Sequence, residues 1–245
     1  MNTRSSELMQ RRSFVKGAAF GLMSVAASLY GVGCSDDGSD RLDTPATLLP
    51  ASPDPNDQFG VDLNINMDNI DDYLNRDDVV YRDMRMFIDP ADFGAIGGDP
   101  NLPDVLEGFK ITPLPYLATL SALPVEGAYA GPCLLDVTRD GQSNIVAVKE
   151  NYLESMMVIN DLFPKDKPIF LACGGAGYSA EMKALLIYMG WDADKLYVIG
   201  PMWGYKGNRV IELIKYPDTQ GGDIIYMLWR ANYAVLDFTL MHSLG

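Results

Sequence analysis

The chain has 245 residues, of which 48% are hydrophobic and 21% are charged, so it can bury a sizeable core and is neither disordered nor fibrous. Its formal net charge of -14 would repel a phosphate backbone, which argues against nucleic acid as a partner. The single histidine, His242, leaves no basis for a histidine triad or a two-histidine zinc site. The three cysteines, Cys34, Cys133 and Cys173, are too few for a disulfide scaffold and lack zinc-finger spacing.

The first 34 residues have the basic, apolar and small-residue regions of an export signal. Residues 10–16 read Gln-Arg-Arg-Ser-Phe-Val-Lys and precede the uncharged stretch 17–33. The paired arginines resemble the twin-arginine export signal, and Gly-Val-Gly-Cys at 31–34 resembles a bacterial lipobox. Cys34 is therefore the expected lipidation site of an exported, membrane-anchored lipoprotein on the periplasmic or cell-surface side. The alternative is an uncleaved transmembrane anchor, for which seventeen uncharged residues are at the short limit.

Three further segments follow this signal. Residues 35–58 are rich in Asp, Ser, Pro and Thr with few large apolar side chains, which predicts a flexible tether. Residues 59–205 are expected to form one domain, and residues 206–245 a C-terminal extension that packs on it. Without residues 1–34 the net charge becomes -17, so the exported part is more acidic than the whole chain.

The expected domain begins with strand and helix signals in alternation. Leu63–Met67 alternates apolar and polar residues and predicts a short strand, and Asp68 is a candidate N-cap for a helix after it. The β-branched and aromatic run Val79–Tyr81 predicts a second strand that leads to Asp83.

The later elements form a regular succession. They are a hairpin of 131–137 and 144–148, a helix over 151–163, a strand over 168–172, a helix over 179–189 and a strand over 196–199. Strand, helix and strand with short links predict a parallel sheet covered on both faces. In the C-terminal extension, the aromatic residues between 224 and 240 have helical spacing and predict a packed helix.

The turn after strand 168–172 carries the clearest chemical signal. It reads Cys173-Gly-Gly-Ala-Gly-Tyr-Ser179, so a thiol at the end of a buried strand precedes a glycine-rich loop and the start of a helix. Three glycines let backbone N–H groups turn inward around the sulfur. These groups and the helix dipole favour a negative species and would lower the pKa of the thiol. Cys173 is therefore the candidate nucleophile.

Ordered motifs along the chain resemble those of the rhodanese-like domain. They are Asp83-Met-Arg85 at a strand end, Lys165 to Cys173 before the loop, Lys183 to Gly190 in the next helix, and Val198-Ile-Gly-Pro-Met-Trp203 at the closing strand. The resemblance spans about residues 63–205, with an insertion near 117–148. It implies an α/β fold with a rhodanese-like central parallel sheet and helices on both faces.

The resemblance also implies an activity. In that family the loop cysteine takes a sulfane sulfur from a donor and passes it to an acceptor thiol, so Cys173 would be the nucleophile and persulfide carrier. The substrate-binding residues would be Gly174, Gly175, Ala176, Gly177, Tyr178 and Ser179. The implied partners are a small sulfur-containing anion or polysulfide and a thiol acceptor, either a protein or a small thiol. No metal or cofactor is implied.

The loop departs from the family pattern in charge. It contains no basic residue, and Tyr178 stands where an arginine is usual. Arg82 and Arg85, or Lys206 and Arg209 beyond the closing strand, are the nearest candidates to hold an anion. The alternative function is a catalytically inactive rhodanese-like module that binds a partner protein or a sulfur species.

The glycine-rich segment 175–180 and Cys133 each have an alternative interpretation. Residues 175–180 fit the dinucleotide fingerprint Gly-x-Gly-x-x-Ala, but no acidic residue ends the following strand, as that fingerprint requires. Cys133 lies in an apolar run, which favours a packed core thiol. A disulfide between Cys133 and Cys173 stays open, because sequence does not place their Cα atoms.

Overall fold

The computed structural model describes residues 47–86, 105–122, 129–211, 214–217, 224–227, 232–233 and 236–245, all within the unit Asp43–Gly245. The predicted export signal, the predicted lipidation site Cys34 and residues 35–46 of the predicted tether lie outside the described residues. Within the described residues, no helix combines the length and the apolar character needed to cross a membrane.

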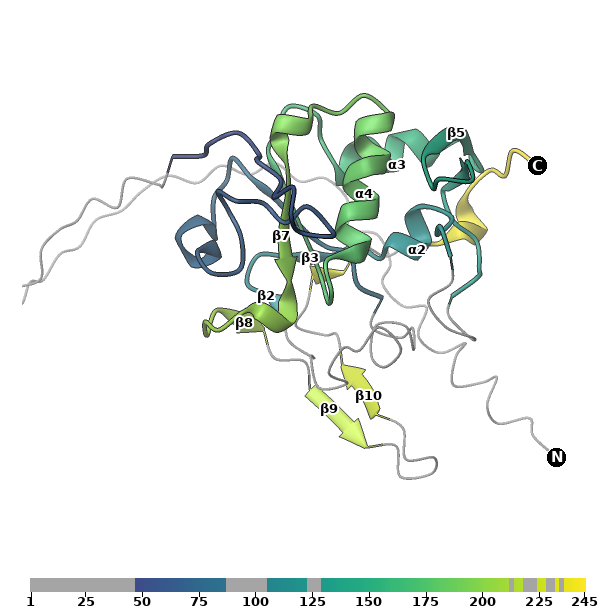
Figure 1. Cartoon of the computed structure of the whole chain (residues 1–245). Coiled ribbons are helices and arrows are strands. Elements are labelled where there is room, and N and C mark those ends of the chain that lie inside the picture. The colour runs from purple at the N-terminus through teal and green to yellow at the C-terminus, as the bar shows by residue number, and fades with distance from the viewer. Residues whose placement is uncertain are drawn as a thin grey trace, which may run out of the picture. The chain divides into compact units, whose positions relative to one another are not determined.

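A parallel sheet forms the centre of the described fold (Figure 1), in the order β11-β3-β1-β6-β7. Its strands are β1 (Val80–Asp83), β3 (Lys110–Ile111), β6 (Ile169–Cys173), β7 (Leu196–Pro201) and β11 (Asn232–Tyr233). All neighbouring pairs are parallel. The prediction of a mixed α/β fold with a central parallel sheet flanked by helices is therefore confirmed.

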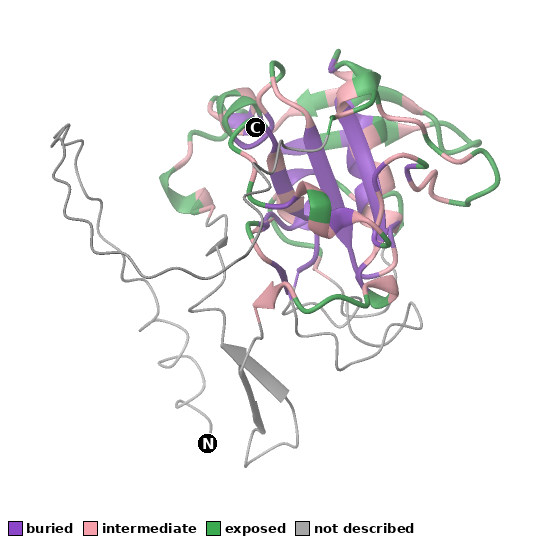
Figure 2. Cartoon of the chain, turned by 90° about the vertical axis from the view of Figure 1, so that its left-hand side faces the viewer, coloured by how far each residue is buried: buried purple, intermediate pink, exposed green. Residues whose placement is uncertain are grey.

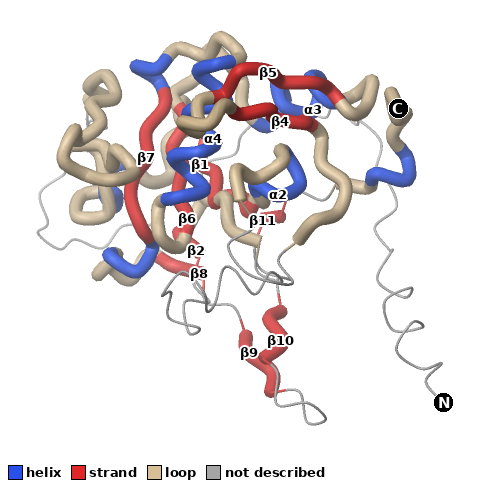
Figure 3. The backbone as a smooth tube through the Cα atoms, turned by 45° about the vertical axis from the view of Figure 1, so that its right-hand side comes forward, coloured by secondary structure: helices blue, strands red, loops and turns tan. Residues whose placement is uncertain are grey.

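Helices and further strands lie around this sheet, as the tube in Figure 3 shows. The helices are η1 (Ile70–Tyr73), α2 (Leu114–Leu117), α3 (Ser155–Leu162), α4 (Gly177–Tyr188), η3 (Ala193–Lys195), η4 (Met202–Gly204) and η5 (Phe238–Leu240). The other strands are β2 (Val105–Leu106), β4 (Leu135–Arg139), β5 (Ile145–Glu150), β8 (Val210–Ile211), β9 (Ile214–Pro217) and β10 (Ile224–Met227). The pairs β2–β8, β4–β5 and β9–β10 are antiparallel.

The strand β6 is buried on both faces, and Figure 2 shows the central strands as the buried part of the fold. Ile169, Leu171 and Cys173 belong to the core that also contains side chains of α3 and α4. Phe170 and Ala172 belong to the core on the opposite face. A continuous apolar run is what a central parallel strand requires, because neither face meets water.

Aromatic packing and the N-terminal segment cover that opposite face. The ring of Phe170 lies edge-on to Tyr81 and Tyr197, with centroid distances of 5.5 and 5.0 Å. The Tyr197 hydroxyl donates to the carbonyl of Leu49 at 2.6 Å, and the Ala51 N–H donates to the carbonyl of Asp194 at 2.8 Å. The ordered contacts of the domain therefore begin about ten residues before Phe59, the boundary expected from composition.

The expected strand over 63–67 and the helix N-cap at Asp68 are both wrong. The segment consists of bends and a turn, and the short helix η1 is preceded by Asn69 instead. The Asp62 carboxylate accepts from the N–H groups of Asn64 and Ile65 at 2.9 and 3.0 Å. Such local side-chain bonds compete with a strand ladder and favour turns, which explains why alternation misled here.

The expected helix between residues 224 and 240 is also wrong. Strand β10 occupies the start of this range and pairs with β9, while β11 adds an edge strand to the central sheet beside β3. Residues Ile224-Ile-Tyr226 favour a strand by their β-branched and aromatic side chains, and the matching run of β9 gives them a partner. The predicted hairpin, strands 168–172 and 196–199, and helices 151–163 and 179–189 are present, with both helices shifted at their N-termini.

One ion pair at the carboxyl end of β1 is fully enclosed. The side chains of Asp83 and Arg85 are 1% and 3% exposed, and the Arg85 Nε donates to the Asp83 carboxylate at 2.9 Å. We expect Asp83→Asn to lower the free energy of unfolding by about 3 to 5 kcal/mol, because it removes the negative charge that lies against a buried guanidinium. Urea unfolding followed by circular dichroism measures this change.

The matched control is Asp78→Asn, which removes an Asp from an ion pair with Arg76 on the surface. Asp78 is 60% exposed, so we expect a change of about 1 kcal/mol or less. Equal destabilisation by the two variants would contradict the claim that the buried ion pair contributes more to stability than the exposed pair.

Candidate active site

Cys173 is the last residue of β6 and stands at the carboxyl edge of the sheet. It is 3% exposed and lines a cavity of about 610 Å³. The same cavity is lined by loop residues Gly174, Gly175, Gly177 and Tyr178. The structure therefore brings the predicted nucleophile and four of the six predicted substrate-binding residues to one cavity.

The other two predicted substrate-binding residues lie behind the cavity wall. Ala176 is 1% exposed and Ser179 is fully buried, and neither lines the cavity. Ser179 instead lowers the pKa of the Cys173 thiol through its side chain and its backbone N–H, although its Oγ has no hydrogen-bond partner among the described residues. Its role is to shape the surroundings of the sulfur rather than to contact a ligand.

An alanine rather than a glycine takes the left-handed conformation in the loop. The left-handed residue is Ala176, with φ 67° and ψ -16°, and it precedes the first residue of α4. The loop glycines have no left-handed φ. Gly175 is needed for space, since a Cβ there would lie 2.6 Å from the ring of Trp203. The glycines thus allow close approach of neighbouring side chains, while an alanine carries the strained conformation.

The pKa of Cys173 departs from the prediction. Burial raises the pKa of the Cys173 thiol above its ordinary value, and the nearby Asp83 carboxylate raises it further. The backbone N–H groups of Ser179 and Tyr178 lower this pKa, as predicted, and so does the Ser179 side chain, but desolvation outweighs them. The expectation of a lowered pKa is therefore wrong, because the strand end is enclosed by packing that the loop sequence does not reveal.

A positive charge reaches the cavity from outside the loop. Arg139, the last residue of β4, lines the cavity and pairs with Glu181 of α4 at 2.6 Å. Arg139 was not among the residues singled out from the sequence. Its only signal was its place between the two predicted strands of the hairpin, within the predicted insertion 117–148.

The basic residues that the sequence singled out lie elsewhere. Arg82 donates to the carbonyl of Leu162 at 2.8 Å, and Arg209 pairs with Glu107 at 3.0 Å. Arg85 pairs with Asp83 below the loop, and neither it nor Lys206 lines the cavity.

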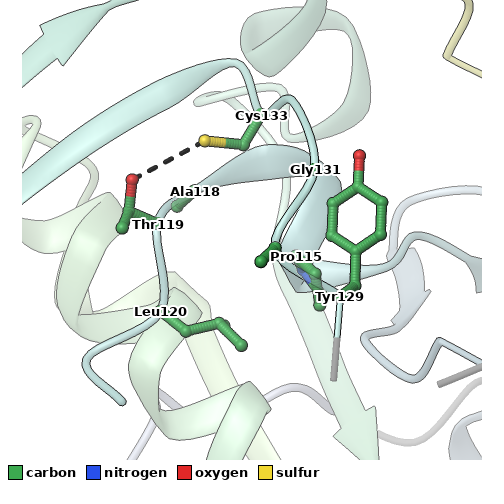
Figure 4. Close-up of a pocket in the computed structure, with 8 residues that line it drawn as sticks. Pro115, Ala118, Thr119, Leu120, Tyr129, Gly131 and Cys133 are labelled. Carbon is green, nitrogen blue, oxygen red and sulfur yellow. Dashed lines mark hydrogen bonds between the residues drawn. The ribbon is translucent and has the colours of Figure 1, made fainter. Parts of the chain in front are cut away.

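Cys133 is half-buried rather than packed in the core, so that prediction is wrong. It lines a second cavity of about 230 Å³ together with Thr119 and Tyr129. Figure 4 shows these side chains. The Thr119 hydroxyl lies 3.6 Å from its sulfur, and the thiol donates to the carbonyl of Leu135 at 3.3 Å. Burial raises the pKa of this thiol too. Both Cys133 and Cys173 are free thiols, so the disulfide left open by the sequence is not formed.

Comparisons of the chain with protein-family models, with curated proteins and with solved structures found no match in any of the three. Among the described residues, no group of three or more His, Cys, Asp and Glu side chains is placed to hold a metal ion.

The left-handed Ala176 gives a stability prediction. We expect Ala176→Gly to raise the free energy of unfolding by about 1 kcal/mol, because glycine adopts this conformation without a clash of Cβ with the backbone. Ala180→Gly is the control inside α4, where the same change should lower it by about 1 kcal/mol. Thermal unfolding of both variants shows whether each change raises or lowers stability. A loss of stability in Ala176→Gly would contradict the claim that Ala176 is strained.

The raised pKa of Cys173 gives a pH prediction. Only the thiolate is alkylated, so the rate of Cys173 modification by iodoacetamide should keep rising at pH values where an ordinary cysteine has already reached its plateau. Peptide mass spectrometry across a pH series measures the midpoint, with the same protein in urea as the reference. If the midpoint in the folded protein were at or below that of the unfolded chain, the N–H groups would lower the pKa of Cys173 by at least as much as burial raises it.

Proposed function

We propose that this chain is an extracytoplasmic, lipid-anchored rhodanese-like protein that carries sulfane sulfur as a persulfide on Cys173. The observation that carries the proposal is the place of this thiol. It ends β6, an interior strand of a parallel sheet, lines a cavity and has its pKa lowered by the backbone N–H groups of Tyr178 and Ser179. The ordered motifs from Asp83 to Trp203 support the same family.

The chemistry follows from that arrangement. Cys173 loses its proton to solvent, and the thiolate attacks the outer sulfur of a donor such as thiosulfate. A sulfur–sulfur bond forms on Cys173, the bond within thiosulfate breaks, and sulfite leaves with the electron pair. An acceptor thiolate then attacks the outer sulfur of the persulfide and restores the Cys173 thiolate. No oxidant or metal enters the cycle.

The loop is suited to the charged intermediate. A persulfide places its negative sulfur one bond farther from the sheet, toward the cavity and the N-terminus of α4. The helix dipole and the N–H groups at that end stabilise an anion. The resting protein is mainly in the thiol form, because burial raises the pKa of Cys173, so uptake of sulfur should be slow at neutral pH and faster in alkali.

The same raised pKa favours a second candidate. A thiol that is 3% exposed and mainly protonated is suited to an inactive rhodanese-like module, which would bind a partner protein or a sulfur species without turnover. In that case Cys173→Ala would leave function and binding intact. Loss of a membrane partner on Cys173→Ala would remove this candidate.

The test of sulfur transfer is the intact mass of the purified protein after treatment with thiosulfate or polysulfide. We expect a gain equal to one sulfur atom, lost again on addition of a reducing thiol, because only a sulfane sulfur is transferred so readily. The gain should be absent in Cys173→Ser.

Cys133→Ser is the matched control, since it removes the other described thiol and should gain sulfur like the unaltered protein. Unchanged mass with several donors between neutral and alkaline pH would overturn the proposal. A gain that depends on Cys133 instead would move the chemistry to the second cavity. The mass of protein isolated from its own membrane reports the lipid proposed at Cys34.

A further inference from the structure

The cavity beside Cys173 is larger and less polar than a bare inorganic anion requires. Its volume of about 610 Å³ lies in the range of sites for small organic molecules. Three aromatic side chains, those of Phe59, Tyr178 and Trp203, line it together with the loop. Phe59 approaches Gly177 and Trp203 approaches Gly175, so both rings lie against the loop that follows the thiol.

Arg139 brings a cation to the same cavity. Its side chain is 14% exposed, and one terminal nitrogen donates to the Glu181 carboxylate at 2.6 Å. Its Nε is buried and has no hydrogen-bond partner among the described residues. A guanidinium has five N–H donors in a planar fork suited to oxyanions, so Arg139 has donors left for a ligand.

Glu181 holds this arginine in place. It accepts from Arg139 and also from the backbone N–H of Ser121 at 3.0 Å. The carboxylate thus ties the inserted hairpin and residue 121 to α4, and it occupies one side of the guanidinium. A ligand anion would compete with its negative charge.

From these contacts we infer that the cavity binds an organic anion, with its oxyanion group on Arg139 and its apolar body against Phe59, Tyr178 and Trp203. For the proposed sulfur transfer, on which this choice of donor rests, the matching class is the organic thiosulfonates. The Cys173 thiolate attacks the outer sulfur of R–SO₂–S⁻, a sulfur–sulfur bond forms on the protein, and the sulfinate R–SO₂⁻ leaves with the electron pair.

The binding test uses ligands that cannot transfer sulfur, so that its outcome is independent of the proposed function. Benzenesulfonate, benzenesulfonamide and methanesulfonate are titrated by calorimetry into the otherwise complete mature chain carrying Cys173→Ser. Benzenesulfonamide keeps the ring without the charge, and methanesulfonate keeps the charge without the ring. We expect benzenesulfonate to bind about tenfold or more tightly than either, since each loses one of the two interactions.

One variant tests the cationic part of the site and another tests its aromatic part. Arg139→Gln should remove the preference for benzenesulfonate over benzenesulfonamide, and Trp203→Ala should remove the preference for benzenesulfonate over methanesulfonate. Lys149→Gln changes the net charge as Arg139→Gln does, on an exposed residue of the same hairpin, and should leave both preferences unchanged. Circular dichroism confirms that each variant is folded.

Glu181→Gln separates a ligand-binding arginine from a purely structural ion pair. Loss of the competing charge should tighten benzenesulfonate binding several-fold, whereas a structural tie would make it weaker. Weaker binding in Glu181→Gln, or equal binding of the sulfonate and the sulfonamide, would overturn the inference. Sulfonate binding without persulfide formation on unaltered Cys173 would instead refute sulfur transfer and leave this site standing.

Discussion

The burial of β6 on both faces determines the positions of Cys173, of the loop after it and of the N-terminus of α4. Apolar side chains on alternate faces of the strand contribute about 1.5 to 3 kcal/mol each when fully enclosed. A shift of one residue would exchange the two faces and place Phe170 where Leu171 now packs. The register of the strand is therefore fixed, and with it the position of Cys173 at the edge of the sheet. The loop and the N-terminus of α4 then follow within a few residues.

The same burial opposes the chemistry that the loop favours. Backbone N–H groups and the helix N-terminus stabilise a negative sulfur, while loss of water around Cys173 destabilises it, and loss of water is the larger effect in the resting protein. In the sulfur transfer that we propose, a persulfide on Cys173 would extend its charge into the cavity and escape part of that cost. Such a protein would favour the persulfide over the free thiolate.

Sequence patterns predicted the parts of the fold that depend on local order. The apolar run of β6, the strand β7 and the hairpin around residue 140 were all evident, because each is a continuous segment with its own turn or stop. The pKa of Cys173 was not evident, since its enclosure comes from α4 side chains such as Met182 and Leu185 and from strands distant along the chain. Arg139 was missed for a related reason. Only the folding of the hairpin against α4 brings it to the cavity.

The loop conformation was beyond sequence reasoning in a different way. Glycines at 174, 175 and 177 predicted a loop that turns its N–H groups inward, but they did not indicate that the left-handed residue is Ala176 or that Gly175 admits the ring of Trp203. Which residue of a short loop takes the strained conformation is decided by the packing around it.

The contact between Trp203 and Gly175 has a practical consequence. Trp203 is 45% exposed and lines the cavity, whereas Trp191 is 5% exposed and its indole N–H donates to the carbonyl of Phe163 at 2.7 Å. Of these two indoles, only Trp203 would sense a change in the loop below it. The site thus contains its own optical probe, and light emitted by this indole can report occupancy of the cavity without any added label.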